Sequence, residues 1–564
     1  MLRYSKVPQK FSARVRAEAF SHIKAQRDYP ETLYKKLHVV QSAESDSRRL
    51  PVDATEADLH NCADQMVRVV YQYAQRWKNP EITADGVAML CKQLGIAEPA
   101  GTTSAEKIAR AVSRSWWLRN LRKEHARRFE NVAVSLGFVS YKAGVYLSDE
   151  SAQRQIKRNK ENAEMLARTE MQNESGQVYT LEELAALGTA NKAIRRGELM
   201  TRIRGFEEIA KDLGHTGMFW TLTCPSKYHA VLSKSGEQNP AYQNLSPREA
   251  QAYLCKVWAR IRAKLKRDGI APYGFRIAEP HHDGCPHWHL LLFVPAEQAK
   301  SLEQTVRRYA LAEDGTEPGA EKNRVKVVTI EAGKGSAAGY IAKYVAKNID
   351  GEHVGEHKTQ DGWVVAPDML GSEEITPSRR VTLWSQLHGI RQFQQIGGAP
   401  VGVWRELRRI DYSRVLHASE DVKQAWAAVQ KSADARASFA EYCKAQGGVL
   451  CGKNYKVRIA RKEIEIIGKY ATYTEQKPCG VYSVTNPHAV FESVRYRWTK
   501  VEKGGAVDCS PWTRVNNCTQ DDEPVEQFTA RIQAQIEKIK AGILKTRCYG
   551  EDADQWFRNW RNRA

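Results

Sequence analysis

The sequence predicts an α+β protein organised around an antiparallel sheet of the split-βαβ plan, with a mainly helical region before it and a mixed α/β region after it. Two observations predict this class. Apolar runs of strand length alternate with longer amphipathic helical patterns in the centre of the chain. Caps and turn residues separate these segments, so their order can be taken from the sequence.

The central region, residues 214–410, contains the order strand, helix, strand, strand, helix, strand. The first helix has a capping box formed by Ser246 and Glu249, with Pro247 at its first position and Gly269 at its end. PHHDGCP supplies the Pro, Asp and Gly of a hairpin loop between the second and third strands. The strands are GMFWTLTC, YGFRIAE, PHWHLLLFV and RVKVVTIE; the helices are SPREAQAYLCKVWARIRAKLKRDG and AEQAKSLEQTVRRYALAED.

Three further regions flank this centre. Residues 1–147 show helical patterns separated by polar turns, and residues 148–213 predict a charged helical arm. SRSWWLRNLRKEHARRFENVAVSLGFV predicts a basic aromatic helix that could contact DNA, although we expect its Trp116 and Trp117 in the core. Residues 411–564 begin with a helical stretch and end in an amphipathic helix, EQFTARIQAQIEKIKAGILK. Between these helices, four strand-like runs predict a small sheet rich in Lys, Arg and Tyr, a composition suited to DNA. The runs are YKVRIA, GKYATYT, GVYSVT and SVRYRWTKV.

Composition indicates a polyanionic partner and a reducing compartment. The 564 residues include 86 Lys and Arg against 66 Asp and Glu, a net charge of +20. The 11 cysteines are scattered without a C-x-x-C pair, and neither an N-terminal signal nor an apolar run of membrane-spanning length is found. We therefore expect a cytosolic protein with reduced thiols and no membrane partner.

Three side chains of the predicted hairpin indicate a metal site. His287 and His289 lie two residues apart in a strand, so both imidazoles leave the same face. Antiparallel pairing would bring Glu279, at the end of the preceding strand, beside them. Two nitrogens and one oxygen, with room for water or phosphate, form an open cation site suited to Lewis-acid chemistry. The alternative is a pair of histidines satisfied by core hydrogen bonds.

A second segment, SAAGYIAKYVAKNI, predicts a helix opened by small residues. Tyr340 and Tyr344 are four residues apart and share one face of that helix. Lys343 and Lys347 each follow a tyrosine by three residues, so two phenols and two ammonium groups flank one stripe. The alternative is a packed tyrosine pair beside solvated lysines. Close to a metal-capable strand pair in a basic chain, we expect these groups to take part in chemistry.

Other residues near these motifs are given no catalytic role. GKGS at 333–336 does not complete the phosphate-loop pattern G-x-x-x-x-G-K-[ST]. His281 and His282 lie in the hairpin loop, where we expect them to be solvated or to face DNA. Four residues between 371 and 410 could support the site, although core packing is the alternative for them. They are Trp384, Arg391, Gln392 and Trp404.

The His-hydrophobic-His motif followed by a Tyr-x-x-x-Tyr helix with interleaved lysines resembles the HUH endonucleases. The longer strings EPHHDGCPHWH and GYIAKYVAKNIDG resemble the replication gene A proteins of temperate tailed bacteriophages. The likeness continues through FWTLTCPSKYH and RRVTLWSQLHGIRQFQQIGGAPVGVWRELRRI, so it covers roughly residues 190 to 410. The resemblance implies an HUH nuclease fold in which the Tyr helix packs across the face that carries Glu279, His287 and His289.

The same resemblance implies an initiator of rolling-circle DNA replication in the bacterial host cytoplasm. Such an enzyme nicks one strand of a phage origin and remains joined to the 5′ end through a phosphotyrosine. We expect Tyr340 and Tyr344 to be the nucleophiles. We expect Lys343 and Lys347 to add positive charge beside them. The expected metal is Mg²⁺ or Mn²⁺, although two imidazoles would also accept Zn²⁺. The expected partners are single-stranded or origin DNA, a host helicase and the replication machinery.

Two other functions stay open at this point. A plasmid relaxase or an HUH transposase would share the metal and tyrosine motifs, although the strings outside those motifs favour the gene A family. A non-catalytic basic DNA-binding replication protein would use the same histidines and tyrosines only for packing. Covalent attachment to single-stranded DNA distinguishes the enzyme from the binding protein.

Overall fold

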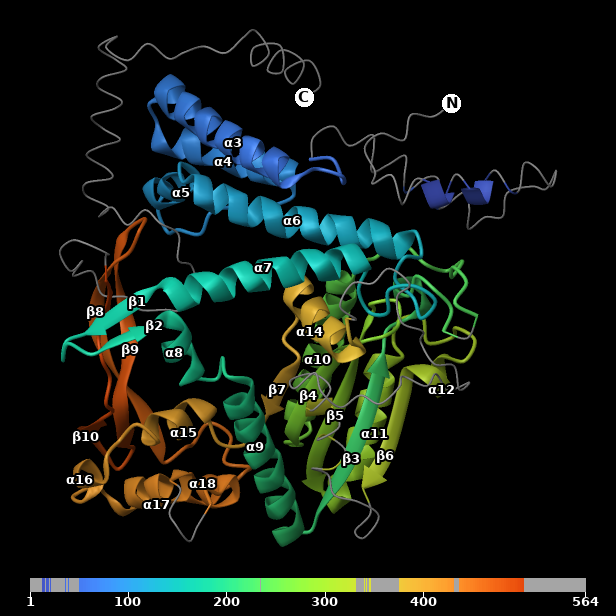
Figure 1. The fold of residues 1–564 in the computed structure, drawn as a ribbon. Helices are drawn as coiled ribbons and strands as arrows, with labels where there is room; N and C mark the ends of the chain where they lie inside the picture. The colour runs from blue at the N-terminus through green and yellow to red at the C-terminus, as the bar shows by residue number, and fades with distance from the viewer. Residues whose placement is uncertain are drawn as a thin grey trace.

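The computed structural model describes residues 50–233, 235–330, 375–430 and 436–501, together with isolated positions within 13–39 and 339–345. These residues form a mixed α+β structure with antiparallel sheets, which confirms the predicted class. Figure 1 shows N-terminal helices at the top, a sheet covered by helices at the right, and C-terminal helices beside a long hairpin at the left. None of the described helices combines the length and the apolar character needed to cross a lipid bilayer.

Five strands form the main sheet in the order β6-β3-β5-β4-β7, and every neighbouring pair is antiparallel. The hairpin strand β5 lies between β3 and β4, and the described elements follow the predicted order β3, α10, β4, β5, α11, β6. The edge strand β7 was not predicted, because two glutamines interrupt its short apolar pattern. The bounds are β3 His215–Thr223, β4 Tyr273–Pro280, β5 Pro286–Pro295, β6 Val325–Ile330 and β7 Phe393–Ile396.

The long helix α10 (Pro247–Arg267) begins and ends where the sequence predicts. Ser246 accepts a hydrogen bond from the Glu249 amide, and the Glu249 carboxylate accepts from the Ser246 amide, as in a capping box. Gly269 follows the helix with a φ of 71°, a conformation that glycine adopts without strain. Together with α11 (Ala299–Ala310) and α14 (Pro377–His388), α10 covers one face of the sheet.

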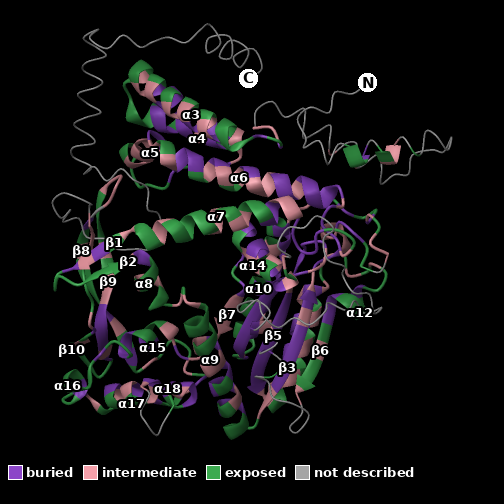
Figure 2. Ribbon diagram, in the orientation of Figure 1, coloured by how far each residue is buried: buried purple, intermediate pink, exposed green. Residues whose placement is uncertain are grey.

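The two faces of the sheet are both apolar but are covered by different parts of the chain. Trp220, Trp288 and Leu290 face α10, α11 and α14. On the opposite face, Phe219 and Leu291 pack against α9 (Lys192–Asp212) and the C-terminal helices. Figure 2 shows the inner strands almost entirely as buried residues. Burial on both faces explains why these strands have continuous apolar runs in the sequence.

Ile341 and Val345, from the predicted Tyr helix, belong to the second of these cores. These two residues lie on the face of the sheet that carries Phe219 and Leu291. Both side chains are fully buried.

The N-terminal region is helical, as predicted. Its helices are α3 (Glu56–Trp77), α4 (Pro80–Leu94), α5 (Ser104–Ala111) and α6 (Arg114–Ser135). They share a core that contains Trp116 and Trp117, so the prediction that these residues are buried is confirmed.

The prediction that residues 148–213 are a helical arm is wrong for its middle part. Two helices, α7 (Asp149–Arg168) and α9, are separated by a short hairpin and the helix α8 (Leu181–Ala186). The hairpin strands are β1 (Glu170–Asn173) and β2 (Val178–Thr180). Between them Asn173 accepts hydrogen bonds from the amides of Ser175 and Gln177. This local turn competes successfully with helix formation.

The C-terminal region contains the predicted small sheet, in the order β10-β9-β8. Three of the four expected strands differ from the prediction. GKYATYT and GVYSVT contribute to one long strand, β9, and SVRYRWTKV contributes β11, which pairs with β1 instead. The bounds are α15 Val401–Leu407, α16 Tyr412–Val415, α17 Glu420–Val429, α18 Phe439–Ala445, β8 Val457–Ile467, β9 Thr472–Ser483, β10 Asn486–Glu492 and β11 Trp498–Lys500. The predicted final helix and the GKGS segment lie outside the described residues.

Candidate metal and nucleophile site

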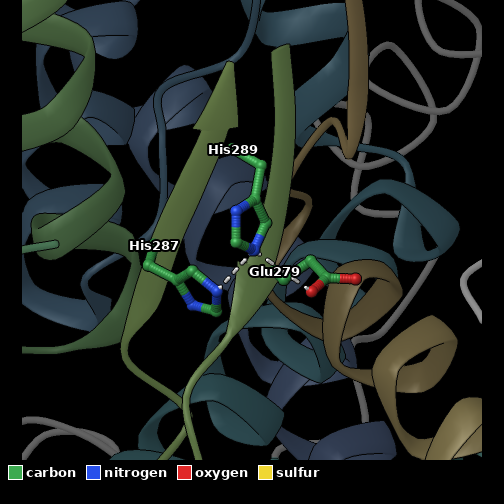
Figure 3. A group of neighbouring side chains, drawn as sticks. All are labelled: Glu279, His287 and His289. Carbon is green, nitrogen blue, oxygen red and sulfur yellow. Dashed lines mark hydrogen bonds and ion pairs between the residues drawn. The ribbon is translucent and has the colours of Figure 1, made fainter. Parts of the chain in front are cut away.

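The β4–β5 hairpin brings the three predicted metal ligands together. Glu279 lies directly opposite His287 in the antiparallel ladder, and His289 follows two residues later on the same face. The Nε2 atoms of the two histidines are 3.0 Å apart, and His289 Nε2 is 3.7 Å from Glu279 Oε2. One potential ligand atom from each residue lies within 4.8 Å of the others. Figure 3 shows the three side chains pointing toward one another.

These separations fit a small divalent cation. Two ligand atoms about 2.1 Å from an octahedral ion, at adjacent positions, lie about 3 Å apart. The two imidazole nitrogens already have that spacing. Glu279 and His289 are only 2% and 7% exposed, so few water molecules compete at this side of the cluster. A bound cation would stabilise the negative charge of a carboxylate buried this deeply.

Two residues of β3 fix the orientation of His289. Thr221 lies opposite His289 in the β3–β5 ladder, and its Oγ1 is 3.1 Å from His289 Nδ1. The Phe219 ring stacks on the same imidazole, with centroids 5.5 Å apart. The hydroxyl therefore holds Nδ1, and Nε2 is left directed toward His287 and Glu279.

Tyr344 is the predicted nucleophile that the structure places at the cluster. Its ring centroid is 4.4 Å from that of His289 and 5.9 Å from that of Phe219. Burial, and then the negative charge of Glu279, raise the pKa of Tyr344 to about 12. The phenol is therefore neutral at physiological pH, and a cation that offsets the charge of Glu279 would make its ionisation easier. Tyr340, Lys343 and Lys347 lie outside the described residues.

The loop between the two strands is held by a buried aspartate. Asp283 accepts hydrogen bonds from His229 Nδ1 at 3.1 Å and from the amides of Ala230 and Cys285. Burial acts to raise the pKa of Asp283, but the charge and hydrogen bond of His229 lower it on balance. Burial acts to lower the pKa of His229, yet Asp283 raises it on balance. The pair is thus an ion pair that fixes the loop carrying the hairpin turn.

His281 and His282 are half-buried and therefore less solvated than expected, and the alternative that they face DNA stays a prediction. The His281 ring lies 4.1 Å from the His287 ring and 5.1 Å from the His229 ring, between centroids. His282 stacks on Tyr146 with centroids 6.0 Å apart. The loop is folded back against the strand end and against residues 141–146, which the loop sequence alone does not indicate.

The supporting residues were only partly foreseen. The roles of Thr221 and Phe219 depend on the register of β3 against β5, and the role of Asp283 depends on its contact with His229 from another loop. The sequence pattern indicates neither contact. Trp384 is completely buried, in agreement with the packing alternative, but its Nε1 also donates to the Gly284 carbonyl in the site loop at 2.9 Å. Core packing and support of the loop are therefore combined in one side chain.

Comparison with known proteins finds a family model and several relatives that are all phage or prophage replication proteins. The model of the bacteriophage replication gene A protein family matches residues 52–352. The chain is 37% identical to "Replication gene A protein" of Escherichia phage 186 over 443 residues, 75% of this chain and 61% of that protein. It is 32% identical to "Probable replication protein P12" of Pseudoalteromonas phage PM2 over 79% of this chain and 64% of that protein.

A third relative is "Probable replication endonuclease from prophage-like region" of Salmonella paratyphi A, which is 32% identical over 75% of this chain and 53% of that protein. The chain thus covers less than two thirds of the length of each of these relatives. No solved structure gives a significant match. The family match spans more than half of the chain and includes the hairpin that carries Glu279, His287 and His289, and on this basis the chain belongs to the bacteriophage replication gene A protein family.

Proposed function

We propose that this chain is a metal-dependent, site-specific single-strand DNA endonuclease and strand transferase that starts rolling-circle replication at a phage origin. The observation that carries the proposal is the position of Tyr344, whose ring lies 4.4 Å from the His289 ring of the Glu279–His287–His289 cluster. A phenol beside an open cation site suits nucleophilic attack on a phosphodiester. Relatives named as replication endonucleases support the same reaction.

We also propose that residues 214–410 form an HUH nuclease domain. Support comes from the position of β5 between β3 and β4, and from the histidine pair at the start of that inner strand. The regions 1–147, 148–213 and 411–564 would then be separate units around the nuclease. The basic C-terminal sheet is our candidate for an additional DNA contact.

The proposed reaction begins at the phenol of Tyr344 or Tyr340. The phenol oxygen forms a bond to the scissile phosphorus while the bond between phosphorus and the 3′ oxygen breaks. The phenol releases its proton to water, and the departing 3′ oxygen takes up a proton from water. The products are a 5′-phosphotyrosine and a free 3′-OH that can prime synthesis. Because the new phosphodiester retains the energy of the original bond, a later 3′-OH can reverse the step and seal a circle without ATP.

Other residues of the site would bind the cation and supply positive charge. Glu279, His287 and His289 would hold the cation, which when bound stabilises negative charge on the phosphate oxygens. Mg²⁺ or Mn²⁺ is our proposal for this cation, because the substrate offers oxygen ligands. Lys343 and Lys347 would add positive charge beside the phenols. The helix spacing of the two tyrosines would let one hold the 5′ end while the other attacks in the next half-cycle.

The proposed setting is the bacterial host cytoplasm. Single-stranded origin DNA would be the substrate, and a host helicase with its replication machinery would use the free 3′-OH. The excess of basic side chains supports a DNA partner.

A covalent-adduct assay tests the proposal. Single-stranded oligonucleotides that tile the replicon encoding the chain are labelled at either end and incubated with the protein and Mn²⁺. We expect the 3′ label to migrate with the protein on a denaturing gel, because the protein retains the 5′ end of the downstream fragment. The 5′ label should appear on a shortened free strand. Tight binding of these oligonucleotides without any adduct would instead identify a non-catalytic binding protein.

A further inference from the structure

The basic side chains of α6 fall into two groups with different surroundings. Those that face α3 are neutralised: Arg114 pairs with Asp64, and Arg122 pairs with Glu56. These pairs fix α6 against α3 within the N-terminal helical core. They explain the charge on that side of the helix without any external partner.

The second group follows a different stripe of the same helix. Arg119, Lys123 and Arg127 are spaced four residues apart, so their side chains lie one above another. Arg248, at the start of α10, joins them. Within the described part of the chain, none of these four side chains forms an ion pair with a carboxylate. We call this group the α6–α10 basic surface.

Two of its guanidinium groups converge on one atom. Arg127 Nη2 is 3.3 Å and Arg248 Nη1 is 2.6 Å from the carbonyl oxygen of His388, at the end of α14. Arg127 Nε also donates to the Leu387 carbonyl at 3.0 Å. Capping the negative end of a helix explains these two arginines in part. It does not explain why exposed Arg119 and Lys123 extend the same positive stripe.

Burial and the like charges of neighbouring members lower the pKa values of two side chains in this group. Burial and then the charge of Arg248 lower the pKa of Arg127 to about 10, although Glu124 acts in the opposite direction. Burial and then the charges of Arg127, Arg248 and Arg119 lower the pKa of Lys123. Like charges at this spacing destabilise the isolated protein, and an anion bound between them would relieve the repulsion.

We propose that the α6–α10 basic surface binds the phosphate backbone of DNA outside the cleavage site. Arginine and lysine are the residues that neutralise DNA phosphates, and a stripe of them along a helix matches a repeating anionic strand. The proposal rests on the proposed nuclease function for its choice of DNA among polyanions.

The location of the surface favours a second contact on the substrate. Trp384 of α14 donates to the Gly284 carbonyl in the loop between Glu279 and His287. His388 lies four residues later on the same helix, a rise of about 6 Å. The basic surface therefore lies about one helical turn beyond the contact with the site loop. Arg127 of α6 and Arg248 of α10 both bond to the end of α14, and Figure 1 shows α14 and α10 at the end of the sheet that lies toward α6 and α7.

Two double variants that each remove two positive charges from α6 test the proposal. Arg119→Gln with Lys123→Gln removes the exposed, unneutralised part of the surface, whereas Arg114→Gln with Arg122→Gln removes charges that are already paired. Binding of long single-stranded and duplex DNA is measured by fluorescence anisotropy between about 50 and 200 mM salt. Circular dichroism and thermal unfolding verify that both proteins are folded.

The first variant should bind DNA more weakly, and its log–log salt slope should fall by about 1.4 units for single strands or about 1.8 for duplex, as expected for two lost phosphate contacts. The form of DNA for which the slope falls by its expected amount is the form that the surface binds. The second variant should retain the parent slope. Equal losses in both variants, or a parent-like slope in the first, would overturn the proposal.

Adduct formation with a short oligonucleotide at saturating concentration separates this proposal from the nuclease function. The Arg119/Lys123 variant should form adduct like the parent, because it contacts DNA away from the reacting phosphate. The parent protein could form no adduct while the Arg119/Lys123 variant still shows a smaller salt dependence of DNA affinity than the parent. In that case the nuclease proposal fails and the DNA-binding surface stands. If adduct forms while the slope is unchanged, the surface proposal alone fails.

Discussion

Replacing Thr221 by valine tests how β3 prepares the metal cluster. Thr221 Oγ1 is 3.1 Å from Nδ1 of the buried His289. If Nε2 binds the cation, Nδ1 must carry the proton and donate it to this hydroxyl. Without metal, the ring can move its proton to Nε2 and avoid an unsatisfied donor. With metal it cannot, so the loss of the hydroxyl should weaken the metal-bound state selectively.

The magnitude follows from the burial of His289. An unsatisfied buried donor costs about 1–3 kcal/mol, which corresponds to about tenfold to hundredfold weaker binding. Loss of an outer partner of a metal-bound histidine has the same range. We therefore expect the Mn²⁺ dissociation constant to rise by about one to two orders of magnitude, with little change in the stability of the metal-free protein.

Calorimetric titration with Mn²⁺ measures this change, and the metal dependence of adduct formation gives a second readout. Thr223→Val is the matched control, because Thr223 lies on the same strand and face but makes no described hydrogen bond to either imidazole. The control should retain parent affinity. Unchanged affinity in Thr221→Val, or an equal loss in Thr223→Val, would refute the assigned role of the hydroxyl.

Three further predictions concern the ligands, the loop and the nucleophiles. His287→Ala should abolish cleavage while circular dichroism shows a folded protein, and full cleavage by the parent in EDTA would contradict a metal requirement. Asp283→Ala should lower the free energy of unfolding in urea by about 3 kcal/mol, because buried donors lose a charged acceptor. The lowered pKa of Asp283 makes its contribution disappear toward acid, and the raised pKa of His229 makes its contribution disappear toward base. The difference between parent and variant should therefore be largest between about pH 4 and 6.5, and a difference independent of pH would contradict the ion pair. Tyr340→Phe and Tyr344→Phe should each still form adduct but fail in coupled cleavage and joining, and the double variant should form none; full coupled turnover by either single variant would exclude alternation.

The parts of the fold that the sequence predicts well are those with a local physical signal. Ser246, Pro247 and Gly269 mark the ends of α10 through capping and backbone preference, and each acts within its own turn. The pairing of Glu279 with His287 follows from a short hairpin, whose length fixes the register. In both cases the residues that determine the geometry are close in sequence.

The parts that were missed depend on contacts between distant segments. β7 pairs with β4 across more than a hundred residues, and β11 leaves its expected sheet to pair with β1. Their sequences, short and rich in polar residues, carry little strand signal of their own. The contact between Thr221 and His289 similarly requires the register of β3 against β5, which no turn between those two strands determines.

The half-buried state of His281 and His282 has the same origin. Loop residues with polar side chains are usually solvated, and the PHHDGCP sequence gives no reason to expect otherwise. His282 is partly buried because Tyr146, from a distant segment, stacks on it. The hydrogen bond between Asp283 and His229 holds the rest of the loop against the protein. Such packing can be inferred only after the sheet and its neighbours are placed.

Identification of the residue that carries DNA tests the central proposal most directly. The protein is incubated with Mn²⁺ and the cleavable oligonucleotide, digested with nuclease and protease, and the peptides are analysed by tandem mass spectrometry. We predict a nucleotide 5′-phosphate on Tyr344 or Tyr340, and no such peptide when His289→Ala replaces the parent. A nucleotide on any other residue, or an adduct that persists in His289→Ala, would contradict a tyrosine nucleophile acting at the Glu279–His287–His289 cluster.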